Sequence, residues 1–223
     1  MTTTPPTERP LRADARRNHD RIVAAAGDAF AEQGLEASME EIARRAGVGA
    51  ATLYRRFPSK QDLLRAVLDS RLRELEPQIA AAVADPDPWE GLLAGMRALL
   101  DAQARNMALV QVLAQAGELT LLRQELGQRV LEPLYRLFAA AQKRGQVRAD
   151  LDPSELKILI RMIITTWVHD EHAGAPPPWP RYLTLLTDAL RTPTPTPLPP
   201  LRRAKSRGGA KRPSRNRCWP SRA

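Results

Sequence analysis

Residues 38–57 read SMEEIARRAGVGAATLYRRF, and this stretch decides the fold of the amino-terminal part of the chain. Ser38 is placed to cap a helix, and Glu41, three residues on, is placed to return a hydrogen bond to the backbone amide of the cap. Gly47 follows the last apolar position, where glycine enters the left-handed conformation without a side-chain clash. The pattern predicts two short helices joined by a tight turn at residues 47–49.

The second of these helices, at about residues 50–56, is expected to end before Pro58, because proline disfavours helical geometry in the residue ahead of it. Leu53 and Phe57 lie one turn apart and are predicted to belong to the core. The opposite face has small residues that let the backbone approach bases, followed by donors that suit phosphate oxygens. This face, which is predicted to enter a groove of DNA, carries Ala50, Ala51, Thr52, Tyr54 and Arg55.

Further DNA contacts are predicted on either side of this helix. Residues 59–62 read SKQD, a second cap box that places Lys60 at a helix amino-terminus, where the helix dipole favours a phosphate. Ser38 joins the set at the start of the first helix. Arg16 and Arg17, ahead of the motif, either follow a groove or phosphate or are merely solvated.

In these residues the chain resembles the tetracycline-repressor (TetR) family of bacterial transcriptional regulators. The resemblance runs without a gap over about residues 16–72. It rests on Ala26, Phe30 and Gly34, on Ser38 with IARRAGV at 42–48, and on TLYRRFPSKQDLL at 52–64. The chain departs from many members at Gly49, Ala50 and Ala51, positions that often help to read bases.

Composition bounds the class of protein. A chain of 223 residues holds one or two domains with an adequate core, and its many leucines and alanines with few aromatics predict an all-α fold. No apolar stretch reaches membrane-spanning length and the first twenty residues are polar, so we expect a soluble, cytoplasmic protein. The single cysteine, Cys218, allows no internal disulfide and no thiolate metal site.

The positive charge is concentrated at the carboxy-terminal end. Ten of the 34 basic residues fall in 191–223, which has no acidic residue, so the rest of the chain is near neutral. This proline-rich segment is predicted to be a disordered basic tail, either a nucleic-acid-binding arm or a merely solvated extension. The predicted division is a flexible basic arm at 1–14, a three-helix helix-turn-helix domain at 15–58, a linking helix at 59–76, an effector-binding and dimerisation domain at 77–190, and the tail at 191–223.

Two helices near the end of the folded part are predicted to form a dimer. The helix at about 153–169 is apolar on more than one stripe, which is more than one neighbouring domain requires. The resemblance implies that it pairs, with the helix at about 179–190, across a two-fold axis; the alternative is a central helix of a monomeric bundle. A two-fold homodimer would read a palindromic DNA site. The predicted interface residues are Leu156, Ile160, Ile163, Trp167, Tyr182 and Leu186.

The resemblance also implies that the carboxy-terminal domain encloses a small-molecule pocket and that ligand binding moves the linking helix, which releases the DNA. The expected protein is therefore an effector-responsive repressor. Methionines adapt to varied apolar shapes, so several are candidates for the lining. The predicted lining residues are Met96, Leu100, Met107, Val110, Leu126 and Met162; each could instead be plain core.

The sequence offers little support for an enzyme. His169 and His172 share a helix face but lie at a helix end before a proline-rich turn, where polar residues are expected anyway, so no metal site is predicted. No nucleophile elbow, glycine-rich phosphate loop or paired-carboxylate pattern is present, and no cofactor is expected. The main rival from another class is a helical scaffold or dimerisation module whose helix-turn-helix has lost DNA binding.

Overall fold

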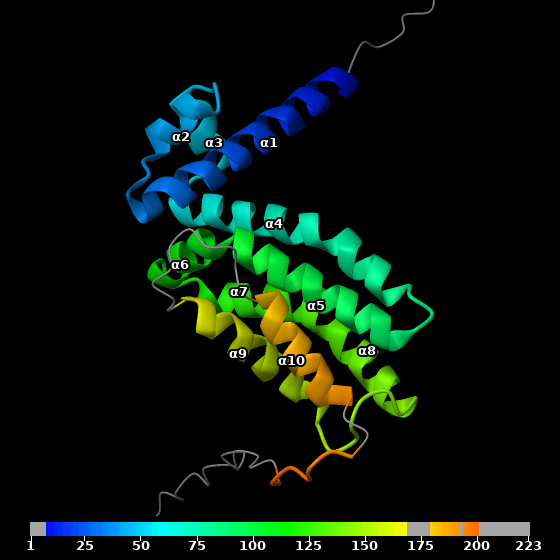
Figure 1. Cartoon of the computed structure of the whole chain (residues 1–223). Helices are drawn as coiled ribbons and strands as arrows, with labels where there is room; N and C mark the ends of the chain where they lie inside the picture. Colours follow the sequence, from blue (N-terminus) through cyan, green and yellow to red (C-terminus); the bar gives the residue numbers. More distant parts are fainter. Residues whose placement is uncertain (1–7, 169–178, 192–193, 201–223) are drawn as a thin grey trace, which may run out of the picture.

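A computed structural model describes the backbone of residues 8–168, 179–191 and 194–200, and the side chains of residues 14–164, 179–191 and 194–200. Over these ranges the chain is helical without any strand, which confirms the predicted all-α class (Figure 1). None of the helices described is long and apolar enough to cross a membrane.

The amino-terminal unit consists of three helices, as the sequence predicted (Figure 1), and their buried residues belong to a hydrophobic core that continues into the later helices. Ile22, Phe30, Ile42 and Leu53 are fully buried there. Gly47 has a φ of +66°, so the turn between the last two helices depends on glycine as expected. The helices are α1 (Glu8–Gln33), followed by the 3-10 turn η1 (Gly34–Glu36), α2 (Met39–Arg45) and α3 (Ala50–Arg56).

The predicted arm at residues 1–14 is wrong for its second half, because α1 already begins at Glu8. Pro10 falls in the first turn of the helix, where a missing backbone N–H costs no internal hydrogen bond. The arginines and alanines that follow have good helix propensity, so nothing in the sequence stops the helix before the motif.

The linking helix α4 spans Lys60–Val83 and is therefore longer than the predicted range of 59–76. Pro77 lies inside it on the solvent side, where the loss of one backbone hydrogen bond is the main cost. Ile79 and Ala82 continue the buried stripe beyond the proline. Burial of this stripe against the next helix outweighs the local helix-breaking tendency.

The carboxy-terminal part lies on the other side of α4, with α5 packed along it and α8 packed on α5 (Figure 1). Asp87 caps α5 by accepting a hydrogen bond from the amide of Trp89 at 2.9 Å. Between Leu119 and Lys143 the helix contains a π-helical turn just before Pro133, and Gly145 follows its end with a φ of +69°. The elements are α5 (Pro88–Arg105), α6 (Met107–Gln115), α7 (Leu119–Leu126), the π turn η2 (Gly127–Leu131), α8 (Glu132–Lys143), the 3-10 turn η3 (Pro153–Glu155), α9 (Leu156–Val168) and α10 (Trp179–Arg191).

Ion pairs join the linking helix to the carboxy-terminal helices. Arg129, in the π turn, donates to Glu76 at 2.7 Å and to Asp69 at 2.8 Å, so one guanidinium holds two turns of α4. Arg65 pairs with Glu118, ahead of α7, at 3.0 Å. These ion pairs connect α4 to the π turn and to the start of α7.

The predicted tail boundary at residue 191 is also wrong in part. Arg191 belongs to α10, and its guanidinium lies 5.0 Å from the ring centre of Trp89. Beyond it, the carbonyl of Thr196 accepts a hydrogen bond from Arg148 at 2.7 Å, and the amide of Leu198 donates to Asp150 at 3.2 Å. Residues 194–200 thus lie against the loop that follows α8.

We expect the contact between Asp150 and Leu198 to survive well into the acid range. The hydrogen bond from Arg148, and with it the amide of Leu198, lowers the pKa of Asp150 from 3.8 to about 2. A carboxyl whose pKa is lowered in the folded state contributes stability above its unfolded pKa and loses it as the pH falls through its folded pKa. A carbon-13 titration of the Asp150 carboxyl should show a midpoint near pH 2, and Arg148→Met should return it toward 3.8. A midpoint near 3.8 in the wild type would contradict the contact.

Candidate nucleic-acid interface

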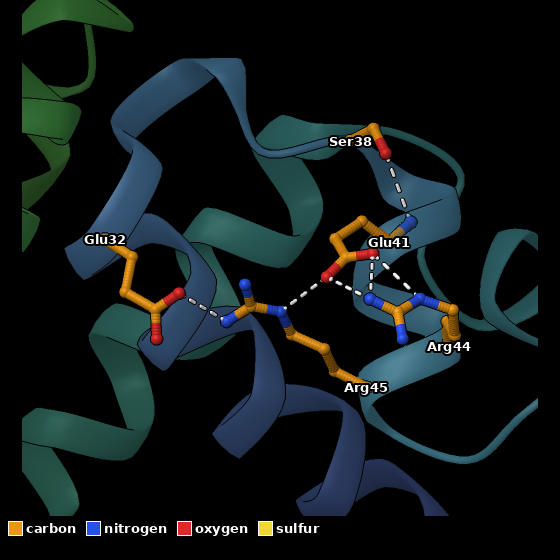
Figure 2. A network of polar contacts seen from close by, with 5 residues as sticks. All are labelled: Glu32, Ser38, Glu41, Arg44 and Arg45. Atoms are coloured by element: carbon orange, nitrogen blue, oxygen red, sulfur yellow. Dashed lines mark hydrogen bonds and ion pairs between the residues drawn. The ribbon is translucent and has the colours of Figure 1, made fainter.

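Ser38 caps α2 as predicted, but the expected reciprocal bond from Glu41 is absent (Figure 2). The hydroxyl of Ser38 accepts the amide of Glu41 at 3.1 Å. The carboxylate of Glu41 instead accepts hydrogen bonds from the guanidinium groups of Arg44 and Arg45 at 2.7–2.9 Å. Two arginines one turn away offer stronger, charge-assisted bonds than one backbone amide does, so the capping box is half formed.

The Glu41 network fixes the motif to α1. Arg45 also donates to Glu32 of α1 at 2.7 Å, so its guanidinium bridges two helices (Figure 2). Hydrogen bonds from Arg45 and then Arg44 lower the pKa of Glu41, which keeps the carboxylate ionised at neutral pH. The sequence analysis missed this bridge, although the spacing of Glu41 and Arg45 is typical of a helical ion pair.

The exposed face of α3 has the composition that the sequence predicted. Leu53 and Phe57 are buried on its inner side. On the outer side Ala50, Ala51 and Arg55 are exposed, Thr52 is half-buried, and Tyr54 is 43% exposed. The outer face therefore offers small residues at its start and polar donors further along.

Tyr54 makes a contact that the sequence analysis did not foresee. Its hydroxyl donates to the carboxylate of Glu40 in α2 at 2.9 Å. The backbone amide of Glu40, then the hydroxyl of Tyr54, lowers the pKa of this carboxyl, while the same bond raises the pKa of Tyr54. An acidic group thus lies on the face that is predicted to meet DNA.

Lys60 and the two arginines of α1, Arg16 and Arg17, differ in the hydrogen bonds and ion pairs that they make within the chain. The ammonium of Lys60, in the first turn of α4, donates to the carbonyl of Leu35 at 2.7 Å, which leaves two of its three donors for other partners. Arg16 and Arg17 are exposed on α1, and Arg17 pairs with Asp14. All three cations lie at or near the surface.

A groove of about 380 Å³ separates the first half of α1 from α3. Thr52, Arg55 and Asn18 lie on its walls. Arg56 also borders it and donates to the ring of His19 at 3.4 Å. Burial, followed by the charge of Arg56, lowers the pKa of His19, so the imidazole is neutral at pH 7. The predicted base-reading residues therefore border a cleft with two guanidinium groups.

Three of the predicted dimer residues lie on the inner face of α9. Leu156, Ile160 and Ile163 are buried in the core of their own chain, because this stripe packs against α5 and α10. Leu186 is partly buried against the same core, while Tyr182 is exposed. We therefore withdraw Leu156, Ile160 and Ile163 as interface residues.

The second stripe of α9 is the one that faces outward. Ile158 is 42% exposed and Met162, predicted as a pocket residue, is 59% exposed. Leu185 on α10 is 58% exposed. We call Ile158, Met162, Tyr182 and Leu185 the α9–α10 apolar face. Met162 belongs to this face and not to a pocket.

A narrow, mostly apolar cavity of about 50 Å³ lies between α4, α5, α6 and α7. Val110 and Leu126 line it, in agreement with the predicted set. Met96 and Leu100 do not border it, because they are fully buried in the core, and neither does the half-buried Met107. The lining consists of Leu68, Arg71, Leu72, Leu75, Leu99, Ala102, Gln103, Asn106, Leu109, Val110, Leu113, Leu122 and Leu126.

Three residues that were named from the sequence have side chains outside the part of the chain that the structure describes. The side chain of Trp167, predicted at the dimer interface, lies outside the described residues, and so do His169 and His172.

Two family models match the chain in succession. The model of bacterial regulatory proteins of the tetR family matches residues 22–67, which hold the later part of α1, the motif and the start of α4. The model of the carboxy-terminal domain of SbtR-like transcriptional regulators matches residues 87–192. Both parts of the structure thus have counterparts in one class of protein.

Individual proteins agree with these models. A TetR transcription regulatory protein from Mycobacterium vanbaalenii is 37% identical in a superposition that covers 81% of this chain and 99% of that one, with a TM-score of 0.60. The TetR transcriptional regulator SCO0520 from Streptomyces coelicolor is 29% identical over 78% of this chain and 98% of its own, with a TM-score of 0.57. The HTH-type transcriptional regulator SrpR of Pseudomonas putida is 29% identical over 63% of this chain and 68% of its own length.

Proposed function

This chain belongs to the tetR family of bacterial regulatory proteins, DNA-binding transcriptional regulators, and on that premise we propose that it is a repressor that binds a palindromic operator as a homodimer and leaves it when a small-molecule effector binds. The observation that carries the proposal is the outer face of α3, where Tyr54 and Arg55 stand exposed over a buried core side. Such a regulator acts in the cytoplasm, where bacterial DNA lies.

The DNA contacts divide by chemistry. Tyr54, Lys60 and Ser38 lie at helix starts or on the outer surface of α3, and they contact phosphates, which position the protein without reading sequence. Thr52 and Arg55 border the groove beside α1 and reach the base edges, where a guanidinium discriminates between base pairs. Ala50 and Ala51 allow α3 to approach the bases closely. Arg16 and Arg17 extend the phosphate contacts along α1.

Two substitutions test this division. Lys60→Ala should weaken binding to every duplex alike and flatten the dependence of affinity on salt by about one unit, because one phosphate contact is lost. Arg55→Ala should also change the sequence preference. The measurement is selection from a random duplex pool, followed by titrations at about 50–200 mM salt. Melting curves check that Lys60→Ala, which also loses the bond to Leu35, remains folded. Wild-type affinity in both variants would refute the assigned contacts.

The homodimer is supported by the α9–α10 apolar face. Exposed apolar residues on two adjacent helices are unfavourable in water, and a second copy covers them with the same residues across a two-fold axis. The family typically forms homodimers. A two-fold dimer presents its two α3 helices about one DNA turn, roughly 34–36 Å, apart, which requires a palindromic operator.

The effector is proposed to enter the cavity between α4 and α7. A drug-sized site has roughly 300–1,000 Å³, so a ligand that fits must push the walls of a cavity of about 50 Å³ apart. Leu68, Leu72 and Leu75 of α4 form one wall, and α4 continues into the motif at Lys60. Expansion of the cavity therefore displaces the linking helix, and the two α3 helices lose the spacing that the operator needs.

A screen of apolar small molecules by thermal shift tests the effector site. A compound that raises the melting temperature should also release operator DNA, because it binds the state that does not bind DNA. Val110→Phe should abolish both effects, because the larger side chain fills the cavity that Val110 lines. Val83→Phe, at the exposed end of α4, is the matched control and should keep both. Release that persists in Val110→Phe would place the effector elsewhere.

A further inference from the structure

An acidic side chain lies among the groups that are proposed to hold DNA phosphates. Glu40 follows the Ser38 cap by two residues in the first turn of α2. It accepts the hydroxyl of Tyr54 at 2.9 Å, and the positive charge of Lys60 acts on the same carboxylate. Glu40 is therefore linked to two proposed phosphate contacts, Tyr54 by a hydrogen bond and Lys60 by charge, and it is itself exposed.

The hydroxyl of Tyr54 can serve only one strong acceptor at a time. A phenol has a single proton to donate, and a DNA phosphate offers only acceptor oxygens at neutral pH. In the free protein that proton is directed at Glu40. The carboxylate is ionised under these conditions, because its own backbone amide and the hydroxyl of Tyr54 lower its pKa. Contact with a phosphate thus requires that the hydrogen bond to Glu40 be broken.

We infer that Glu40 competes with DNA phosphate for Tyr54 and so lowers the affinity of the protein for every duplex. This inference rests on the proposed DNA-binding function. Two effects contribute: the lost hydrogen bond, and the repulsion between the carboxylate and the phosphate. Neither depends on base sequence, because phosphates are alike on all sequences. Glu40 consequently sets the strength of the binding, while Thr52 and Arg55 set its preference.

Two substitutions at Glu40 separate these effects. Glu40→Gln removes the charge and keeps an acceptor for Tyr54, whereas Glu40→Ala removes both. The matched control is Glu90→Ala, which removes another exposed acid from the first turn of a helix, α5, in the other part of the molecule. All three substitutions lower the negative charge of the chain by one, so a difference between them reports on position and not on total charge.

The probe is a duplex of about 30 base pairs with scrambled sequence, titrated by fluorescence anisotropy at about 50–200 mM salt. Glu40→Gln should bind about threefold tighter than the wild type, the effect of one unit charge several ångströms from a phosphate in water. Glu40→Ala should bind about tenfold tighter, because the hydroxyl of Tyr54 is then free as well. Glu90→Ala should match the wild type. The melting temperatures of all variants confirm that they are folded.

The Tyr54→Phe background isolates the hydroxyl. There Glu40→Ala should tighten binding by only about threefold, because no tyrosine proton is left to compete for. The inference is overturned if neither Glu40 variant binds the scrambled duplex more tightly than the wild type, or if the gain of Glu40→Ala is as large in the Tyr54→Phe background. A folded wild-type protein that binds no duplex at 50 mM salt, a condition in the typical range, would overturn the proposed DNA-binding function itself.

Discussion

A protein with Leu185→Glu is expected to be monomeric and to bind its operator at least about a hundredfold more weakly than the wild type. Leu185 is 58% exposed in the single chain, so a glutamate there is tolerated by the protomer itself. In a two-fold dimer the same glutamate is buried twice without a partner, at a cost of several kcal/mol. A monomer holds one half-site only, and the loss of linked binding amounts to roughly 10²–10⁴ in affinity.

Sedimentation and operator titration measure the two effects. Val83→Glu is the matched control, because Val83 is also an exposed apolar residue, 45% exposed, but lies at the end of α4 and outside the α9–α10 apolar face. It should remain dimeric. Ile163→Glu should behave differently again and lower the melting temperature, because Ile163 is buried in its own chain. A dimeric Leu185→Glu protein with wild-type affinity would remove α10 from the interface.

The contrast between Ile163 and Ile158 shows what the sequence of α9 could not decide. Both stripes of the helix are apolar, so helical periodicity predicts two buried faces without saying which one belongs to the protomer. The choice depends on tertiary packing: α5, which is distant in sequence, and α10, the next helix of the chain, both contact α9, and Ile160 and Ile163 are buried. The proposed interface therefore moves to the second stripe of α9, with Ile158 and Met162, and keeps Tyr182 of α10.

Features that depend on neighbouring residues, such as helix caps and turns, were predicted more reliably than features that depend on tertiary packing. The cap at Ser38 and the turn at Gly47 were predicted correctly, because each depends on residues within one turn. The linking helix was predicted to end too early, at residue 76, since burial of Ile79 and Ala82 maintains α4 beyond Pro77. Propensity is a weak prior that tertiary packing overrides.

The candidate DNA face shows the same limit at the level of side chains. The sequence predicted that Tyr54 and Arg55 would be exposed, because Leu53 and Phe57 fix the inner side of α3. It did not predict that the hydroxyl of Tyr54 would bind Glu40, fourteen residues earlier. That contact depends on how α2 crosses α3, which no local spacing encodes.

Gly91→Ala is expected to lower the free energy of unfolding by about 2–4 kcal/mol, the range for overpacking that a backbone must absorb. A β-carbon on Gly91 would lie 2.3 Å from the carbonyl oxygen of Ala82, closer than any real contact. Ala82 is part of α4, so the only relief is a separation of α4 from α5. The packing of α5 on α4 at this point therefore depends on a residue without a side chain.

Alanine substitutions at two further glycines, Gly127 and Gly95, allow the stabilities of three variants to be ranked by how closely the new β-carbon meets its neighbours. Gly127→Ala meets no atom within 4 Å and has a helical φ of −58°, so it should raise the stability by about 0.5–1 kcal/mol. Gly95→Ala meets the end of the Leu134 side chain at 2.4 Å, which can rotate away at a smaller cost than a backbone. The melting temperatures should rank Gly127→Ala, wild type, Gly95→Ala, Gly91→Ala from high to low.

The functional consequence of Gly91→Ala follows from the same contact. The helix-turn-helix motif ends just before α4 begins at Lys60. A shift of α4 away from α5 therefore changes the spacing of the two α3 helices in the proposed dimer. We expect the variant to lose affinity for the operator while its binding to scrambled duplex, which needs no fixed spacing, falls less. Paired titrations below the melting temperature of the variant measure the difference. Equal losses on both duplexes would show that Gly91 affects stability alone, and an unchanged melting temperature would contradict the packing of α4 on α5.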